Sequence, residues 1–241
     1  MLKTIILAAG KGTRMKSDLP KVLHTIKNIP MAKYVTDAAR SAGADEICYI
    51  IGYKKEEVKA ALVAPNVCFA VQDEQLGTGH AVKCAMDFIG REGSIMVLCG
   101  DTPLIGGDTL RRFADYHKDN HNSVTVLSAI VDNPEGYGHI IRDENGEFLY
   151  SIEHKDADDE QKKVKEINAG MYVFEAADLA DALSELRCDN AQGEYYLPDT
   201  LEIIKRKGKK AGAYVIESAE EIMGVNTPEQ LEEAAAVIER R

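Results

Sequence analysis

The chain opens with a glycine-rich segment whose residue types suit phosphate binding. Residues 7–15 read Leu-Ala-Ala-Gly-Lys-Gly-Thr-Arg-Met and continue an apolar run that starts at Thr4. Backbone N–H groups can approach an anion closely in such a loop, because glycine has no side chain in the way. Lys11, Arg14 and Lys21 add positive charge to the same region. The pattern predicts a nucleotide phosphate site, although an ordinary strand-to-helix turn would also use these glycines.

The distribution of charge supports a local anion site. Residues 1–33 carry seven Lys or Arg and a single Asp, whereas the whole chain has a formal net charge of −11. Nucleic-acid binding usually shows as a basic domain or stripe, so one basic segment in an acidic chain argues against it. Met15 stands at the third glycine position of G-x-G-x-x-G, and the chain contains no G-x-x-x-x-G-K-[ST]. Both a dinucleotide oxidoreductase and a P-loop ATPase are therefore disfavoured.

Asp101 and Asn226 are the candidate metal ligands. Asp101 follows a strand-like apolar run and Gly100, although an Asp just before a Thr-Pro pair could also simply start a turn. Thr227 and Gln230 form a capping box for the last helix, which leaves the Asn226 side chain without a capping role. A carboxylate and an amide oxygen make the partial shell that Mg²⁺ accepts when water and phosphate oxygens complete its octahedron.

These residues together favour one class of reaction. A divalent ion with Arg14 and Lys21 could clamp a triphosphate, and stabilising charge on the phosphates is the main catalytic task in such transfers. A sugar phosphate is already anionic at neutral pH and needs no general base, in keeping with the lack of an evident His and carboxylate pair beside the loop. The sequence therefore predicts nucleotidyl transfer rather than hydrolysis.

In the first half of the chain, strand-like and helix-like segments alternate. Strands are expected at Thr4–Ala8, Glu46–Ile51, Val67–Val71 and Ser94–Cys99. Helices are expected at Met31–Ala42, Glu56–Leu62 and Gly79–Ile89. This order is typical of a three-layer α/β/α, Rossmann-like fold with a mostly parallel mixed sheet. Ligands collect at the carboxyl ends of parallel strands, so Gly10, Gln72 and Asp101 should meet in one crevice.

The second half predicts an antiparallel excursion followed by helices. Strands are expected at Ser123–Val131, His139–Arg142, Phe148–Glu153 and Glu166–Phe174, with turn residues between them. Helices are expected at Ala177–Leu186, Leu197–Lys207 and Pro228–Arg240. No repeat or flexible linker interrupts the chain. We therefore expect a single domain over residues 1–241, with one lobe over about 1–105, a second over about 106–226 and a C-terminal helix over 228–240.

Length and composition indicate the size of the core and the cellular compartment that we expect for this protein. A chain of 241 residues can bury the core of one large α/β domain. Its five cysteines are odd in number and lack C-x-x-C spacing, which predicts buried thiols in a reducing cytosol. The chain shows no signal-peptide pattern and no apolar run near the ~20 residues of a membrane helix, so a cytoplasmic protein is expected. His117 and His121 have helical metal-pair spacing, but without a third evident ligand they do not predict a zinc site.

Several motifs occur in a fixed order along the chain. They are residues 7–15, Asp18–His24, Glu74–Ala81, Gly100–Leu104, Gly136–Gly138, Glu153–Ala157, Asn190–Tyr196 and Gly224–Asn226. Together they resemble the N-acetylglucosamine-1-phosphate uridyltransferase family over residues 5 to about 226. The resemblance implies a sugar-nucleotidyltransferase domain that makes UDP-N-acetylglucosamine and pyrophosphate from UTP and N-acetylglucosamine 1-phosphate, with Mg²⁺, in the synthesis of peptidoglycan precursors.

The resemblance also implies roles for individual residues. The catalytic pair would be Arg14, facing the leaving pyrophosphate, and Lys21, holding the α-phosphate, while Asp101 and Asn226 would bind the metal. Contacts to the nucleotide would come from Leu7, Ala8, Ala9, Gly10, Gln72, Gly77, Thr78, Cys99 and Gly100. Contacts to the sugar would come from Gly138, Glu153 and Asn168.

Departures from the family pattern keep alternatives open. His139 stands where the family usually has Arg, Ala169 replaces a common Thr, and Leu197-Pro198-Asp199 ends the tyrosine motif differently. All three lie in or near the sugar half, so another sugar 1-phosphate or nucleoside triphosphate is the first alternative. A non-catalytic nucleotide-binding regulator is the second. Many relatives continue into an acetyltransferase domain of hexapeptide repeats, and none occur in this sequence, so acetyl transfer is not expected.

Overall fold

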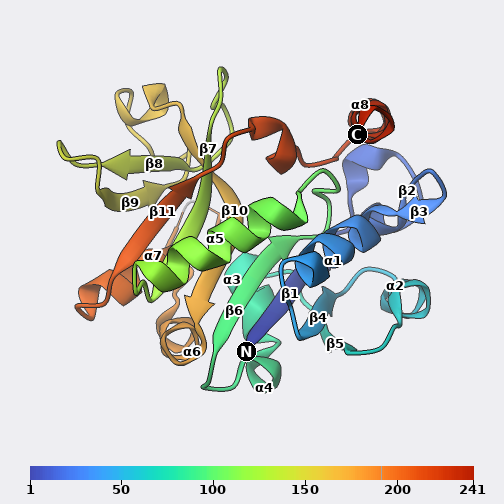
Figure 1. Cartoon of the computed structure of the whole chain (residues 1–241), viewed down its shortest axis with the longest axis horizontal. Helices are drawn as coiled ribbons and strands as arrows, with labels where there is room; N and C mark the ends of the chain where they lie inside the picture. Colours follow the sequence, from blue (N-terminus) through green and yellow to red (C-terminus); the bar gives the residue numbers. More distant parts are fainter. Residues whose placement is uncertain (191) are drawn as a thin grey trace.

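A mixed β-sheet forms the centre of the computed structural model, which describes residues 1–190 and 192–241 (Figure 1). Its main path has the strand order β11-β7-β10-β6-β1-β4-β5. The parallel strands are β1 (Leu2–Ala8), β4 (Glu46–Ile51), β5 (Val67–Val71) and β6 (Ser94–Cys99). The nearly continuous apolar sequences of β1, β4 and β6 fit strands that are buried on both faces, whereas every residue of β5 is at least partly exposed. The predicted mostly parallel sheet is therefore confirmed.

The second half of the chain adds the antiparallel part of the sheet. The strand β10 (Glu166–Glu175) pairs antiparallel with both β6 and β7 (Val124–Ile130), and β11 (Ala211–Val215) runs parallel to β7. The hairpin of β8 (His139–Arg142) and β9 (Phe148–Ile152) joins the sheet through β10. Because β10 lies between β6 and β7, the two halves of the chain share one sheet. A separate small hairpin is formed by β2 (Thr25–Ile26) and β3 (Ile29–Pro30).

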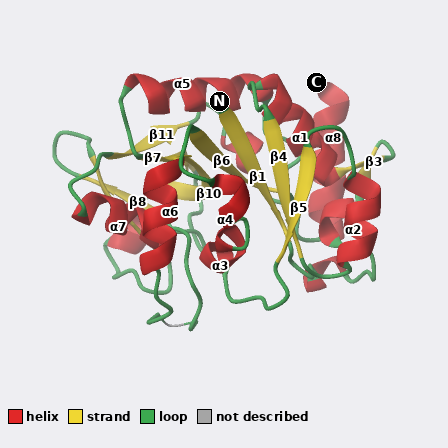
Figure 2. Cartoon of the chain, turned by 90° about the horizontal axis from the view of Figure 1, so that it is seen from below, coloured by secondary structure: helices red, strands yellow, loops and turns green. Residues whose placement is uncertain are grey.

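Helices cover both faces of the sheet (Figure 2). One face packs against α1 (Met31–Ser41), α2 (Lys55–Leu62) and α5 (Gly107–Asp119). The other packs against α3 (Thr78–Lys83), α4 (Met86–Ile89), α6 (Ala176–Glu185) and α7 (Asp199–Arg206). The last helix, α8 (Pro228–Arg240), packs beside the small hairpin. Short 3₁₀ turns occupy Thr13–Met15, Lys21–Leu23, Gln161–Lys163 and Ala219–Ile222.

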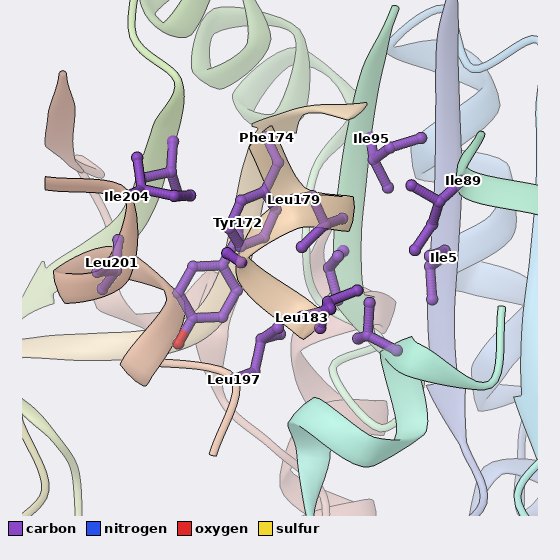
Figure 3. Packing of buried hydrophobic residues seen from close by; sticks show 14 of the residues in the cluster. Ile5, Ile89, Ile95, Tyr172, Phe174, Leu179, Leu183, Leu197, Leu201 and Ile204 are labelled. Carbon is purple, nitrogen blue, oxygen red and sulfur yellow. The ribbon is translucent and has the colours of Figure 1, made fainter. Parts of the chain in front are cut away.

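Strand alternation divides the core into two layers. Ile5 and Ile6 are neighbours in β1, yet each is fully buried and they point to opposite faces of the sheet. Figure 3 shows one of these layers, in which side chains of the strands, such as Ile95 and Phe174, meet Leu179 and Leu183 of α6. Burial on both sides holds β1 rigidly, and so the glycine-rich loop after it has a fixed starting point.

The structure corrects three sequence-based expectations about the elements and the thiols. The helix expected over Gly79–Ile89 is two short helices, α3 and α4, separated at Cys84 and Ala85. His117, noted in the sequence for its helical spacing with His121, lies near the end of α5 and is buried against Thr125 and Glu175. No strand was expected at β11, whose sequence Ala-Gly-Ala-Tyr-Val carries a weak strand pattern because a small residue fills each of its first three positions.

The expectation of five buried thiols is also wrong. Only Cys48 is fully buried, Cys68 is exposed, and the other three are partly exposed, although all five are free thiols. Cys68 lies on the edge strand β5, where no further strand covers it. Within the described residues, no helix has both the length and the apolar character that crossing a bilayer requires.

Candidate active site

The carboxyl ends of three parallel strands border one cavity of about 340 Å³. Gly10 follows β1, Gln72 follows β5 and Asp101 follows β6, as their positions after apolar runs predicted. We call this space the strand-end cavity. Ten predicted nucleotide, catalytic or metal residues line it, namely Leu7, Ala8, Ala9, Gly10, Lys21, Gln72, Gly77, Thr78, Cys99 and Asp101.

One wall of the strand-end cavity carries a glutamine in a fixed orientation. The side chain of Gln72 is almost fully buried, and its Nε2 donates to the carbonyl of Gly77 at 3.0 Å and to Nδ1 of His80 at 3.2 Å. Gln75 ties the same loop to the glycine-rich segment, because its Nε2 donates to the carbonyl of Ala9 at 2.7 Å. A carboxamide held in this way can present defined polar atoms to a base edge.

The predicted catalytic and metal-binding residues form one connected cluster. The ammonium group of Lys21 contacts Oδ2 of Asp101 in an ion pair and donates to Oδ1 of Asn226 at 2.9 Å. Nη2 of Arg14 donates to the same Asn226 oxygen, also at 2.9 Å. The side chains of Lys21 and Asp101 are only 16% and 20% exposed, so water screens their attraction weakly. Four residues from distant parts of the sequence thus meet at one point.

Backbone contacts hold Asn226 in the cluster. The amide of Val225 donates to the carbonyl of Asp101 at 2.8 Å, which anchors the segment before α8 to the end of β6. The hydroxyl of Thr227 accepts from the amide of Gln230 at 3.3 Å as the helix cap. The Gln230 side chain differs from the expected capping box, because its Oε1 accepts from the amide of Asn226 at 2.8 Å. The Asn226 carboxamide is therefore free of capping and points to the cluster.

The donor set of this cluster fits a hard divalent cation. Asp101 Oδ2 and Asn226 Oδ1 converge on one cationic atom, the Nζ of Lys21, so their spacing already suits a shared positive centre. Within residues 1–190 and 192–241, no three His, Cys, Asp or Glu side chains gather as a metal site. Two oxygens from the chain would suit Mg²⁺ bound together with substrate phosphates and water.

A second cavity, of about 350 Å³, adjoins the first. The three predicted sugar contacts, Gly138, Glu153 and Asn168, all line it. We call it the hairpin cavity, because Gly138 precedes β8 and Glu153 follows β9. The residues that line both cavities are Leu7, Thr78, Cys99 and Glu194. A ligand in one cavity would therefore lie next to a ligand in the other.

Polar side chains of the hairpin cavity are held by specific contacts. Asn168 is largely buried, and its Nδ2 donates to the hydroxyl of Tyr172 at 2.9 Å and to Oγ of Ser151 at 3.1 Å. Burial, with a smaller contribution from the charge of Asp156, raises the pKa of the Glu153 carboxyl. Hydrogen-bond donors stabilise a carboxyl group in such a buried position, and the hydroxyls and amide of a sugar would provide them.

The thiol of Cys99 lies on the wall shared by the two cavities. Burial raises its pKa to about 12, with a smaller rise from the nearby Asp101 charge. The group is thus a neutral thiol at physiological pH, and a neutral thiol is a poor nucleophile. Cys99 can contact a ligand by packing but is not a candidate for covalent catalysis.

Two loops meet where the cavities join. The amide of Tyr195 donates to the carbonyl of Leu76, and the amide of Gly79 donates to the carbonyl of Tyr195, both at 2.8 Å. Gly77 has a φ of 103°, and a Cβ at this position would lie 2.6 Å from the Tyr195 carbonyl oxygen. Glycine is therefore required here both for its conformation and for the close approach. Ala191, in the middle of the predicted Asn190–Tyr196 motif, lies outside the described residues.

Some predicted residues lie away from the cavity walls. Arg14 and Asn226 line neither cavity, although both belong to the cluster beside the first. Gly100 is packed beneath the site, where a Cβ would come 2.8 Å from the carbonyl oxygen of Leu7. His139 lies behind the hairpin cavity and Ala169 lines it. The geometry supports a packing role for Gly100.

Sequence reasoning missed other residues of the two walls. They include Val22, Gln75, Ala81 and Glu194 on the strand-end cavity, and Gly136, Tyr137, Gly170, Tyr172 and Gln192 on the hairpin cavity. Gln75, Ala81 and Glu194 lie within motifs that carried the resemblance, and their place in those motifs was the signal that could have found them. Val22 also lies within such a motif, Asp18–His24, whereas the sequence context of Tyr172 indicates only core packing.

Comparison with known proteins agrees with this geometry. The family model described as nucleotidyl transferase matches residues 3–237. The chain is 52% identical over 240 residues to the bifunctional protein GlmU of Caldanaerobacter subterraneus subsp. tengcongensis, and 48% identical over 239 residues to that of Clostridioides difficile. These alignments cover 100% and 99% of this chain and 52% of each relative, so the chain spans about half the length of the curated relatives it matches.

A solved structure shares the fold. A putative glucose-1-phosphate thymidylyltransferase from Bacillus anthracis, in complex with a sucrose, superposes with a TM-score of 0.78 over 98% of this chain and 95% of its own. Its sequence identity is only 22%, so the likeness concerns the fold. The predicted resemblance is confirmed at the level of the family, since the matched model spans nearly the whole sequence. This chain belongs to the nucleotidyl transferase family.

Proposed function

We propose that this protein is a uridyltransferase that converts UTP and N-acetylglucosamine 1-phosphate into UDP-N-acetylglucosamine and pyrophosphate. The observation that carries the proposal is the joining of two cavities at Leu7, Thr78 and Cys99, beside the Lys21 cluster. Two adjoining cavities suit the transfer of a group between two ligands. Two observations support the choice of substrates. The chain is about half identical to the GlmU relatives, and the residues proposed to contact the sugar line the second cavity.

In this proposal the nucleotide occupies the strand-end cavity. Backbone groups of residues 7–10 hold the ribose and phosphates, and the fixed carboxamide of Gln72, with Gly77 and Thr78, reads the uracil edge. The sugar phosphate occupies the hairpin cavity, where Glu153, Asn168 and Gly138 hydrogen-bond its hydroxyls and acetamide. The lobes proposed for these two tasks are residues 1–105 and 106–226.

The transfer is an in-line displacement at the α-phosphorus. An anionic oxygen of the sugar phosphate forms the new O–P bond as the bond to the bridging oxygen of the pyrophosphate breaks, and the electron pair leaves with pyrophosphate. No proton has to move. Lys21 stabilises negative charge on the α-phosphate and Arg14 stabilises the leaving group. Asp101 and Asn226 would hold Mg²⁺, which when bound supplies positive charge to the triphosphate oxygens.

Pyrophosphate release tests the proposal. We expect release from UTP and Mg²⁺ to depend on N-acetylglucosamine 1-phosphate, and Asp101→Asn to lower kcat on the order of 10²-fold or more. The matched control is Asp37→Asn, since Asp37 is exposed on α1 and pairs only with Lys33 among the described residues. Release with another sugar 1-phosphate alone would retain the reaction and change its substrate. Absence of release with every sugar phosphate would favour a nucleotide-binding regulator.

A further inference from the structure

Two histidines form a hydrogen-bonded pair directly behind the hairpin cavity. Nδ1 of His139 lies 2.9 Å from the carbonyl oxygen of Val164, and its Nε2 lies 2.9 Å from Nδ1 of His154. The ring centroids lie 5.2 Å apart with 30° between the ring planes, so the rings meet edge to edge through this hydrogen bond. His139 has no exposed surface, and neither histidine lines the strand-end cavity or the hairpin cavity. The pair thus lies next to the proposed sugar site without contacting a ligand in it.

The carbonyl of Val164 sets the arrangement of protons. A carbonyl can only accept, so Nδ1 of His139 carries the hydrogen and its Nε2 is the acceptor in the neutral ring. Nδ1 of His154 must then donate to that Nε2. Each histidine has a defined tautomer, and loss of the His154 donor would leave a buried acceptor on His139 without its partner.

The pair ties together the backbone that carries the sugar-facing residues. His139 pairs with Ile152 across β8 and β9, so Gly138 and Glu153 come next in register on the cavity side. A Cβ on Gly138 would lie 3.4 Å from both Glu153 Oε1 and Asn168 Cβ, which shows how closely the three meet. The amide of Asn168 also donates to the carbonyl of Gly138 at 2.8 Å.

The contacts of His139 and His154 link the turn at residues 153–157 to two other segments of the chain. The amides of Asp156 and Ala157 both donate to the carbonyl of Glu153 at 3.0 Å, and these bonds are local. The His154 side chain adds a bond to β8, and His139 extends it to Val164 just before β10. Three chain segments around the cavity are therefore linked through two imidazole rings.

We propose that His139 and His154 are positioning residues for the sugar phosphate, which hold Gly138 and Glu153 at the separation that sugar binding requires. The proposal rests on the function proposed above. Because the rings lie behind the cavity wall, disrupting the pair should weaken the binding of the sugar phosphate and leave the nucleotide cavity unchanged. A cavity whose walls are already ordered binds its ligand more tightly, because fewer side chains and backbone segments have to be ordered on binding.

Substitutions of His154 test the proposal, because this ring is only partly buried and its loss should be tolerated by the fold. We expect His154→Ala to raise the KM for N-acetylglucosamine 1-phosphate about 10-fold, with kcat and the KM for UTP changed by less than about 2-fold. His154→Asn should restore most of the affinity, because its amide nitrogen can occupy the position of Nδ1. His154→Gln should not, because its amide reaches the position of Nε2.

The control variant is His121→Ala, since His121 is exposed just beyond α5 and away from both cavities. Calorimetric titration of each variant with N-acetylglucosamine 1-phosphate in the presence of UDP gives a second readout that does not need turnover. An unchanged KM and Kd in His154→Ala, or equal values for the Asn and Gln variants, would overturn the positioning role while the proposed function stands. Absence of both turnover and binding in the unmodified protein would overturn the two proposals together.

Discussion

Removing the Lys21 ammonium should expose the proposed cation site of the cluster. In the structure this group occupies the point on which Asp101 Oδ2 and Asn226 Oδ1 converge. Lys21→Met keeps most of the side-chain length and removes the charge. We expect it to lower stability in the absence of metal and to increase the stabilisation that Mg²⁺ provides, because the two oxygens then lack their internal cation.

The size of both effects follows from the burial of the ion pair. Breaking a buried pair costs about 3–5 kcal/mol, and the 16% and 20% exposure of these side chains places this one near the lower end, at about 3 kcal/mol. Mg²⁺ at about ten times its dissociation constant would then return about 1.4 kcal/mol. In the unmodified protein the gain should be smaller, since Mg²⁺ must first displace Lys21.

Urea unfolding of both proteins, with EDTA and with Mg²⁺, measures these quantities. The matched control is Lys33→Met, because the Lys33–Asp37 pair is a surface i,i+4 contact at 3.0 Å with both side chains more than half exposed. That control should change stability by no more than about 0.5 kcal/mol. Equal stabilisation of the unmodified protein and of Lys21→Met by Mg²⁺ would refute the assignment of these oxygens to a cation site.

Two further predictions concern groups outside the cluster. Burial, with a smaller contribution from Glu202, raises the pKa of Asp199 to about 6. Between about pH 4 and pH 7 the unfolded chain therefore binds fewer protons than the folded protein, and the free energy of unfolding falls as the pH rises. Asp199→Asn should therefore be more stable than the unmodified protein near pH 8 by about 1 kcal/mol, after allowance for the solvent that reaches the carboxyl, and equally stable near pH 4. Urea unfolding at several pH values measures this difference in stability. A difference that does not depend on pH would contradict the prediction. Cys68, the exposed thiol, should react first with Ellman's reagent, whereas burial raises the pKa of Cys48 and should make that thiol slow. A fast phase that survives Cys68→Ser would contradict this order.

Local patterns in the sequence determined most strands and the edge of the sheet where the site lies. The runs at β4, β5 and β6 were predicted with the bounds that the structure shows. For β4 and β6 the apolar run reflects burial on both faces, whereas β5 is an edge strand whose residues are at least partly exposed. Parallel strands place their carboxyl ends at one edge, which is why Gly10, Gln72 and Asp101 were expected together and do line one cavity. The order of the motifs then identified the family, which the comparisons confirm.

Only the tertiary structure decided which distant side chains meet. Lys21 contacts Asp101 and Asn226, which are 80 and 205 positions away, and no local pattern encodes such a pairing. His139 drew notice in the sequence as a departure in the sugar half, yet its side chain turns away from the cavity and binds His154 across the β8–β9 hairpin. Strand register sets that partner, and register depends on how the whole sheet packs. Sequence periodicity describes which face of an element is apolar, whereas the contacts between elements arise only when those faces are buried together.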